Sequence, residues 1–70
     1  MNIDIRKSIN NNFKDSKIDD IKLSIDEAIS EHDEITLPGL GVFFEILWLN
    51  SNESEKHNIL SILQKNIKKD

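Results

Sequence analysis

Residues 35–48 of this 70-residue chain read Ile-Thr-Leu-Pro-Gly-Leu-Gly-Val-Phe-Phe-Glu-Ile-Leu-Trp, and this segment decides the fold. It holds both glycines and the only proline, followed by the only tryptophan and two of the three phenylalanines. Pro38 fixes its own φ angle and disfavours a helical Leu37, while Gly39 and Gly41 permit positive φ values. We therefore expect the chain to turn at residues 38–41.

The apolar block that follows, residues 42–49, fits either a strand or a helix. Its aromatic residues and isoleucine favour a strand with alternating faces. In a helix, one wide apolar stripe would form from Leu40, Phe43, Phe44, Leu47 and Trp48. We predict a helix that begins near Gly41, because neighbouring helices can bury such a segment on most sides. Glu45 is then expected on the exposed stripe or paired with a lysine such as Lys7 or Lys65.

Two segments before this block have apolar residues at helical spacing. The first helix has an apolar face of Ile5, Ile9 and Phe13. We expect it to close at the polar run of residues 10–12. The second helix has an apolar stripe of Ile18, Ile21, Ile25, Ala28 and Ile29. We expect Ser16 and Asp19 to cap its start and the helix to run to about Glu31.

The C-terminal segment predicts a further helix. Asn52 and Glu55 have the spacing of a capping box. The apolar stripe behind them consists of Ile59, Leu60, Ile62, Leu63 and Ile67. Positive charge in the final turns suits the helix dipole, and it comes from Lys65, Lys68 and Lys69.

These elements predict one all-α domain, residues 1–70, built as a small bundle of three to four short helices with a Pro-Gly-Leu-Gly turn. Residues 37–49 are expected to pack between the second and last helices. The alternative is an α+β fold with two helices, a β-hairpin around residues 38–41 and a C-terminal helix, similar to HU-type DNA-binding proteins.

The small size of the chain limits what its core can supply. The core of a domain of this length typically contributes only about 3–5 kcal/mol to the free energy of unfolding, so a cross-link, a metal ion or a partner is often needed as well. The chain has no cysteine, so neither a disulfide nor a thiolate zinc site can meet this need. Self-association is therefore an expected source of stability.

Composition also argues against an enzyme. Neither His32 nor His57 has a second ligand at metal-binding spacing, and the paired carboxylates are adjacent in sequence rather than opposed across a cleft. We expect no catalytic residue, metal, cofactor or small-molecule substrate. The longest uninterrupted apolar stretch is residues 46–49, and residues 1–6 lack the apolar run of a secretory signal. We expect a soluble, cytoplasmic protein.

Net charge bears on nucleic-acid binding. Thirteen acidic residues against nine basic ones give a net charge of −4, which disfavours sequence-independent coating of DNA. The string Leu-Pro-Gly-Leu-Gly nevertheless resembles the hairpin of helix–hairpin–helix DNA-binding modules, whose backbone N–H groups hold a phosphate. The candidate nucleic-acid contacts under this hypothesis are Gly39, Gly41, Lys65, Lys68 and Lys69. The plainer interpretation is a structural turn between two core elements.

The chain as a whole resembles the small acid-soluble spore protein I family of endospore-forming bacteria. Residues 37–48 are close to the most specific motif of that family, and residues 1–9, 26–29 and 55–63 resemble its other segments. The polar run at residues 10–12 departs from the family pattern, as does Leu49. The resemblance implies synthesis in the forespore and residence in the spore core, but it transfers no site residue.

The resulting hypothesis is a non-enzymatic spore-core protein that associates with itself as a homodimer or with another protein. The candidate interaction residues are Pro38, Gly39, Gly41, Phe43, Phe44, Leu47 and Trp48. Leu49 adds apolar surface beside Trp48, which favours burial or self-association. The rival hypothesis is nucleic-acid binding through the turn backbone and nearby lysines.

Overall fold

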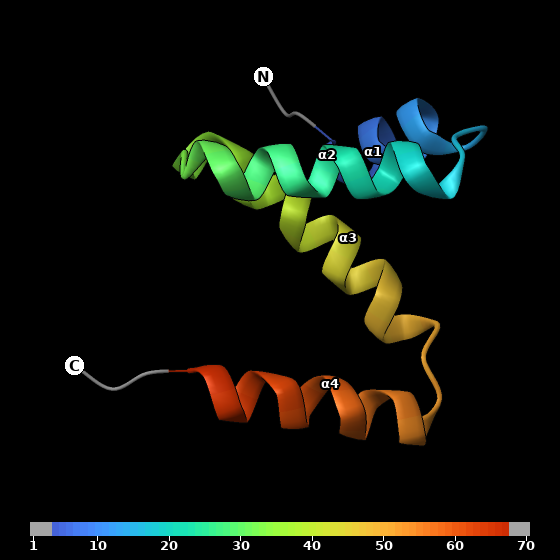
Figure 1. Ribbon diagram of the computed structural model, residues 1–70. Coiled ribbons are helices and arrows are strands. Elements are labelled where there is room, and N and C mark those ends of the chain that lie inside the picture. Colours follow the sequence, from blue (N-terminus) through green and yellow to red (C-terminus); the bar gives the residue numbers. More distant parts are fainter. Residues whose placement is uncertain (1–3, 68–70) are drawn as a thin grey trace.

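The computed structural model describes residues 4–67, and the regular structure of these residues is entirely helical (Figure 1). The elements are α1 (Ile5–Phe13), α2 (Ile18–Glu31), the 3-10 turn η1 (Glu34–Thr36), α3 (Leu37–Leu49) and α4 (Glu53–Asn66). The predicted all-α fold is confirmed. The alternative with a β-hairpin around residues 38–41 is wrong, because both flanks of that segment are helical within the described chain.

The start of α3 differs from the prediction. The helix begins at Leu37, four residues before Gly41, and Pro38 lies in its first turn, where a missing N–H group costs nothing. Neither Gly39 nor Gly41 has a positive φ angle. The predicted turn at residues 38–41 is therefore wrong.

The chain turns earlier, between α2 and α3. His32 ends α2 in the left-handed conformation, with a φ angle of 51°. The turn η1 follows and continues directly into α3. The Thr36 hydroxyl donates to the carbonyl oxygens of Asp33 (2.7 Å) and Ala28 (3.2 Å), which ties the turn back to α2. The direction of α3 is thus set before Pro38.

Polar caps fix the helix starts. Asp4 accepts a hydrogen bond from the Lys7 N–H at 3.0 Å, and α1 then runs through the asparagines of residues 10–12 instead of ending there. The cap of α2 lies one residue later than predicted: the Lys17 N–H donates to Asp20 at 3.3 Å. The predicted end of α2 is confirmed at Glu31.

The capping box of α4 is confirmed in both directions. The Glu55 N–H donates to Asn52 Oδ1 at 2.8 Å, and the Asn52 N–H donates to Glu55 Oε1 at 2.9 Å. Both hydrogen bonds satisfy N–H groups that a helix start otherwise leaves unpaired. The start of α4 is therefore encoded locally.

Packing is concentrated at the first half of α3. α1 is its main helical neighbour, with a smaller contribution from α2, so the expected placement between the second and last helices is only partly realised. Phe13 of α1 meets Phe43 of α3 edge-on, with ring centroids 5.2 Å apart. Ile9 approaches Gly39, and Val42 is the one buried side chain of residues 4–67.

The second half of α3 leaves this core and leads to α4. Figure 1 shows α3 as a diagonal link between the layer of α1 and α2 and the separate helix α4. The radius of gyration is 13.7 Å, against about 11 Å for a compact domain of 70 residues. The molecule is therefore open, and α4 is an arm rather than a member of a closed bundle.

Candidate interaction surface

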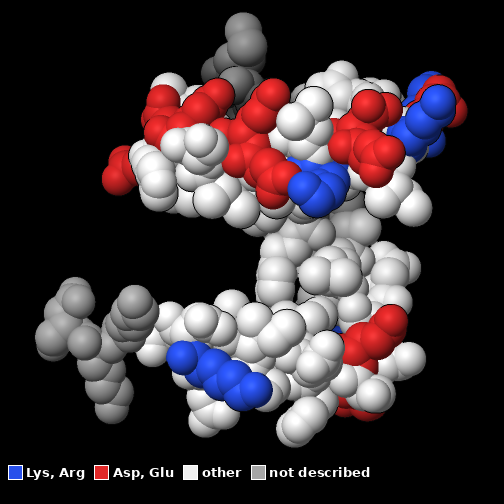
Figure 2. Space-filling view, viewed as in Figure 1, with Lys and Arg blue, Asp and Glu red and all other residues white. Residues whose placement is uncertain are grey.

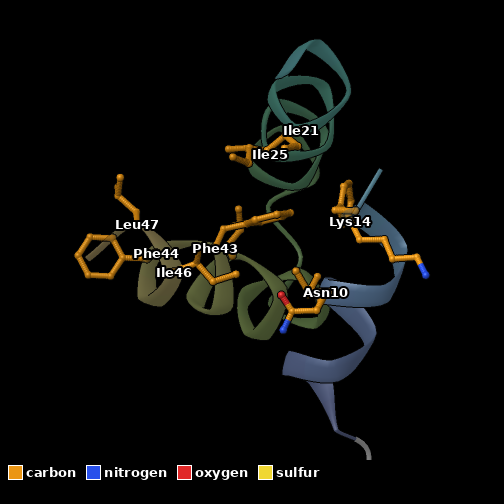
Figure 3. Close-up of a pocket in the computed structure, with 11 residues that line it drawn as sticks. Asn10, Lys14, Ile21, Ile25, Phe43, Phe44, Ile46 and Leu47 are labelled. Atoms are coloured by element: carbon orange, nitrogen blue, oxygen red, sulfur yellow. The ribbon is translucent and has the colours of Figure 1, made fainter. Parts of the chain in front are cut away.

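An apolar groove lies between α1, α2 and α3 and has a volume of about 650 Å³. Its apolar lining comprises Ile9, Phe13, Ile21, Ile25, Leu40, Phe43, Phe44, Ile46 and Leu47. In Figure 3, Ile21 and Ile25 of α2 lie across from Phe43 of α3. Asn10 of α1 and Lys14, directly after this helix, supply the polar edge of the groove. The three N-terminal helices thus leave an unfilled apolar surface between them.

A second apolar hollow joins α3 to α4. It is lined by Phe44, Trp48, Leu49 and Leu60, together with Glu45, and has a volume of about 370 Å³. Phe44 also lines the groove, so the two hollows adjoin at this ring.

Leu60 extends the apolar surface along α4. It also lines a third hollow, with Leu63 of α4 and Ile67 just after the helix as its other apolar residues. The polar lining of this hollow consists of His57, Ser61 and Gln64. The three hollows therefore follow one another from the groove to the end of the arm. We call this succession the apolar face.

Most charged side chains lie away from the apolar face, and Lys14 and Glu45 are the charged residues that line its groove and second hollow. Figure 2 shows Asp and Glu gathered over α2, and the space between α2 and α4 remains open in the space-filling view. The acidic residues of α2 are Asp19, Asp20, Asp26, Glu27 and Glu31. The surfaces on the two sides of this space are formed mainly by uncharged residues. Such an arrangement suits an apolar partner better than a polyanion.

An ion pair locks α1 onto α3 beside this face. Arg6 Nε and Nη2 donate to the two carboxylate oxygens of Glu45 at 2.8 and 2.7 Å. Hydrogen bonding to Arg6 lowers the pKa of Glu45, and Glu45 in turn raises the pKa of Arg6. The expected partners of Glu45, Lys7 and Lys65, were the wrong choice. Sequence spacing could not find Arg6, since 39 residues separate the two side chains.

The predicted interaction residues do not share one environment. Phe43 points into the molecule and packs on Phe13, Gly39 is half-buried against Ile9, and Pro38 and Gly41 are exposed. These positions serve the internal packing of α3 or the first turns of the helix.

The other three predicted residues, like Phe43, line hollows of the apolar face. Phe44 and Leu47 are 44% and 50% exposed, and Phe44 stacks on Trp48 with ring centroids 5.9 Å apart. Lys56 of α4 places its ammonium group 5.2 Å from the centre of the Trp48 ring, which holds the arm to α3. Leu60 and Leu63 of α4 also belong to this face, although sequence reasoning assigned them only to a helix stripe.

The candidate nucleic-acid contacts are dispersed. Gly39 and Gly41 lie within α3. The N–H group of Leu37, the first residue of this helix, already donates to the Glu34 carbonyl oxygen. Lys65 is an exposed residue in the last turn of α4. Lys68 and Lys69 fall outside the described residues.

Residues 4–67 show neither a group of three or more His, Asp and Glu side chains able to hold a metal ion nor a helix long and apolar enough to cross a bilayer.

Comparison with known proteins assigns the chain to a family. The family described as small, acid-soluble spore protein I matches residues 3–67. The chain belongs to this family. Small, acid-soluble spore protein I of Bacillus mycoides (strain KBAB4) is 38% identical over 69 residues, which cover 99% of this chain and 100% of that relative. The proteins of the same name from Bacillus cereus (strain ATCC 14579) and Bacillus anthracis (strain A0248) match with the same identity and coverage.

Membership of the small acid-soluble spore protein I family connects the chain to sporulation and to the spore. The family is not an enzyme family by name. The full-length match confirms the resemblance inferred from residues 37–48. No solved structure is significantly similar to this chain. The arrangement of the apolar face is therefore described from the structure of this chain alone.

Proposed function

We propose that this chain is a non-enzymatic protein of the spore core, made in the forespore, that acts by association through its apolar face. The partner is a second copy of the chain or another spore-core protein. Family membership supports the spore setting, and the apolar face supports association as the mode of action.

The observation that carries this proposal is the imbalance between buried and exposed apolar side chains. Val42 alone is buried within residues 4–67, whereas Leu49 is 72% exposed and Leu60 is 51% exposed. Each 100 Å² of apolar surface removed from water contributes about 2.5 kcal/mol. A chain that leaves so many leucine and isoleucine side chains exposed gains more from a partner than from its own core.

Nucleic-acid binding remains the rival function, and the geometry favours it less. A phosphate site at Gly39 and Gly41 needs unpaired backbone N–H groups, either in a turn or at a helix start. Both glycines lie in the first turns of α3, where Pro38 has no N–H group and the Leu37 N–H already donates to the Glu34 carbonyl oxygen. The acidic cover of α2 also opposes a polyanion.

Sedimentation velocity over a wide range of protein concentration tests the proposal. We expect the weight-average mass to rise with concentration. We also expect Trp48→Ala to raise the dissociation constant at least tenfold, equivalent to about 1.4 kcal/mol, because it removes the ring that stacks on Phe44.

Ile35→Ala is the matched control for this measurement. Ile35 is 83% exposed and lines none of the three hollows of the apolar face, so its loss should leave the dissociation constant unchanged. A single monomeric species at every concentration, with no binding to other spore-core proteins, would contradict the proposal.

A further inference from the structure

We propose that two copies of this chain clasp each other, so that α4 of each copy lies in the apolar groove between α1, α2 and α3 of the other. The inference rests on the self-association proposed above and specifies its geometry. The occupant of the groove is therefore a defined segment, Glu53–Asn66, of a second identical chain.

The arm α4 is a complete helix whose apolar stripe is covered only in part, by the end of α3. Its capping box satisfies the first N–H groups, so the helix start does not depend on tertiary contacts. Within the stripe Ile59 is half-buried, whereas Leu63 is 41% exposed and Ile67 is also exposed. A helix of this kind gains most of its stability from packing that stripe against another surface.

The link between α3 and α4 holds the arm away from the groove of its own chain. The Asn50 side-chain amide donates to the Ile46 carbonyl oxygen at 2.8 Å, and the Ser51 hydroxyl donates to the Leu47 carbonyl oxygen at 2.6 Å. Asn52 is fixed by the capping box of α4. All three link residues are thus tied down, and the space between α2 and α4 stays open in Figures 1 and 2.

The groove lacks the fourth helix that would complete a bundle. Its walls come from α1, α2 and α3, and Phe44 and Leu47 lie at the edge toward the end of α3 (Figure 3). Helical bundles bury apolar stripes by packing several helices around one core. Insertion of α4 from a second copy supplies the missing helix, and two-fold symmetry makes both insertions equivalent.

The surface area of the chain fits a dimer. The accessible surface is 6480 Å², whereas a compact monomer of 8.1 kDa exposes about 4,500 Å². The excess is about 2,000 Å², and even half of it exceeds the roughly 800 Å² that each partner contributes to a standard interface. Two reciprocal insertions are an arrangement that can remove surface on this scale.

Cross-linking between two single-cysteine variants tests the inference, because the chain has no native cysteine. Ile46→Cys marks the groove, and Leu63→Cys marks the arm. An equimolar mixture is treated with a bismaleimide that has a short flexible spacer. We expect the mixed cross-linked dimer to exceed the statistical yield, which is half of all dimers when pairing is random.

A charge substitution supplies the second measurement. Leu63→Glu should raise the dimer dissociation constant at least tenfold while helix content by circular dichroism is retained. Ile35→Glu introduces the same charge at an exposed apolar residue outside the groove and the arm, and it should leave the dimer intact.

The outcomes separate the inference from the function on which it rests. A dimer that survives Leu63→Glu, with no enrichment of the mixed cross-link, would overturn the clasp but leave self-association standing. An intramolecular cross-link in a monomeric Ile46→Cys/Leu63→Cys double variant would show that the arm closes on its own groove, which also overturns the clasp. A wild-type chain that stays monomeric throughout would overturn both the clasp and self-association.

Discussion

Arg6 and Glu45 show how single side chains set the packing of this small fold. Their two parallel hydrogen bonds join α1 to α3 next to the close approach of Ile9 to Gly39. A bidentate guanidinium–carboxylate pair fixes orientation as well as distance. Both side chains remain in contact with solvent, so the pair acts mainly as an alignment device for α1.

Glu45→Gln should destabilise the fold in a pH-dependent manner. The pKa of Glu45 is lowered from its usual 4.5 in the folded state, chiefly by the hydrogen bonds from Arg6. The pair therefore stabilises the fold above pH 4.5, and this contribution is lost as the pH falls through the lowered pKa. Thermal unfolding followed by circular dichroism should show a difference between wild type and variant at neutral pH that shrinks below pH 4.5.

Glu53→Gln is the control for this pH series. The Glu53 carboxylate lies 3.9 Å from the Lys56 ammonium, and its side chain is 96% exposed, so the variant should unfold like the wild type. A Glu45→Gln effect that does not change with pH would contradict the assignment to the ion pair.

Gly41→Ala should stabilise the protein. A Cβ atom at residue 41 meets nothing within 4 Å, and the residue lies in the helix α3. Alanine is favoured over glycine in a helix interior by about 0.5–1 kcal/mol. Urea unfolding should report a gain of that size in the free energy of unfolding, whereas a backbone turn with positive φ at this residue would produce a loss.

Gly39→Ala is the companion variant to Gly41→Ala. The added Cβ atom would lie 3.8 Å from Ile9 Cδ1, an ordinary van der Waals contact, so this substitution should also be tolerated. A marked loss at Gly39 alone would show that α1 cannot move away from α3.

At the scale of elements, α4 differs from the three helices before it. Those helices meet around Phe43 and Val42, while α4 is held at its start by Lys56 over Trp48. The stability of α4 therefore depends on its own N-terminal cap more than the stability of α1 or α2 depends on theirs. Local encoding of a helix is what allows it to serve as an arm.

Asn52→Ala should loosen α4 selectively. The substitution removes the side-chain acceptor for the Glu55 N–H, and loss of such a cap costs about 1 kcal/mol. Hydrogen exchange should become faster in α4, with little change in α1 and α2. Asn58→Ala, which replaces an exposed amide in the middle of the same helix, should leave exchange unchanged or slower. Equal acceleration in all helices would argue against a separate arm.

At the scale of the whole molecule, the open shape and the sparse core belong together. One buried side chain within residues 4–67 cannot supply the free energy that a folded domain needs against its conformational entropy. The association proposed above would bury the apolar face without lengthening the chain. The net charge of −4 then serves solubility and opposes contact with nucleic acid.

Titration of short duplex DNA into the protein should leave the fluorescence of Trp48 unchanged at low and at moderate salt. The acidic balance of the chain, the acidic cover of α2 and the missing N–H group of Pro38 all weigh against a phosphate site at residues 38–41. A saturable change that weakens steeply with salt would instead establish the nucleic-acid function. The same titration at high salt serves as the control for optical artefacts.

Much of the local structure could be predicted from the sequence, because it depends on neighbours in the chain. Spacing of apolar residues identified α2 and its end at Glu31, and the pair Asn52 and Glu55 identified the start of α4. The same spacing fitted residues 42–49 to a strand as well as to a helix, and the helix that we predicted there is confirmed. The glycines, however, were mistaken for a turn. Pro38 is compatible with a first helical turn as well as with a loop, so its local preference could not decide between them.

The sequence by itself determined which residues are helical over most of the chain, the family to which the chain belongs, and an apolar stripe on each helix. Only the tertiary structure decided which side chains meet: Phe43 meets Phe13, Arg6 pairs with Glu45, and Lys56 of α4 lies over Trp48 at the end of α3. The physical reason is that helix formation and capping act over about four residues, whereas packing joins residues far apart in the chain. An apolar stripe in the sequence shows that one side of a helix favours burial. Only the three-dimensional arrangement shows where that side remains exposed.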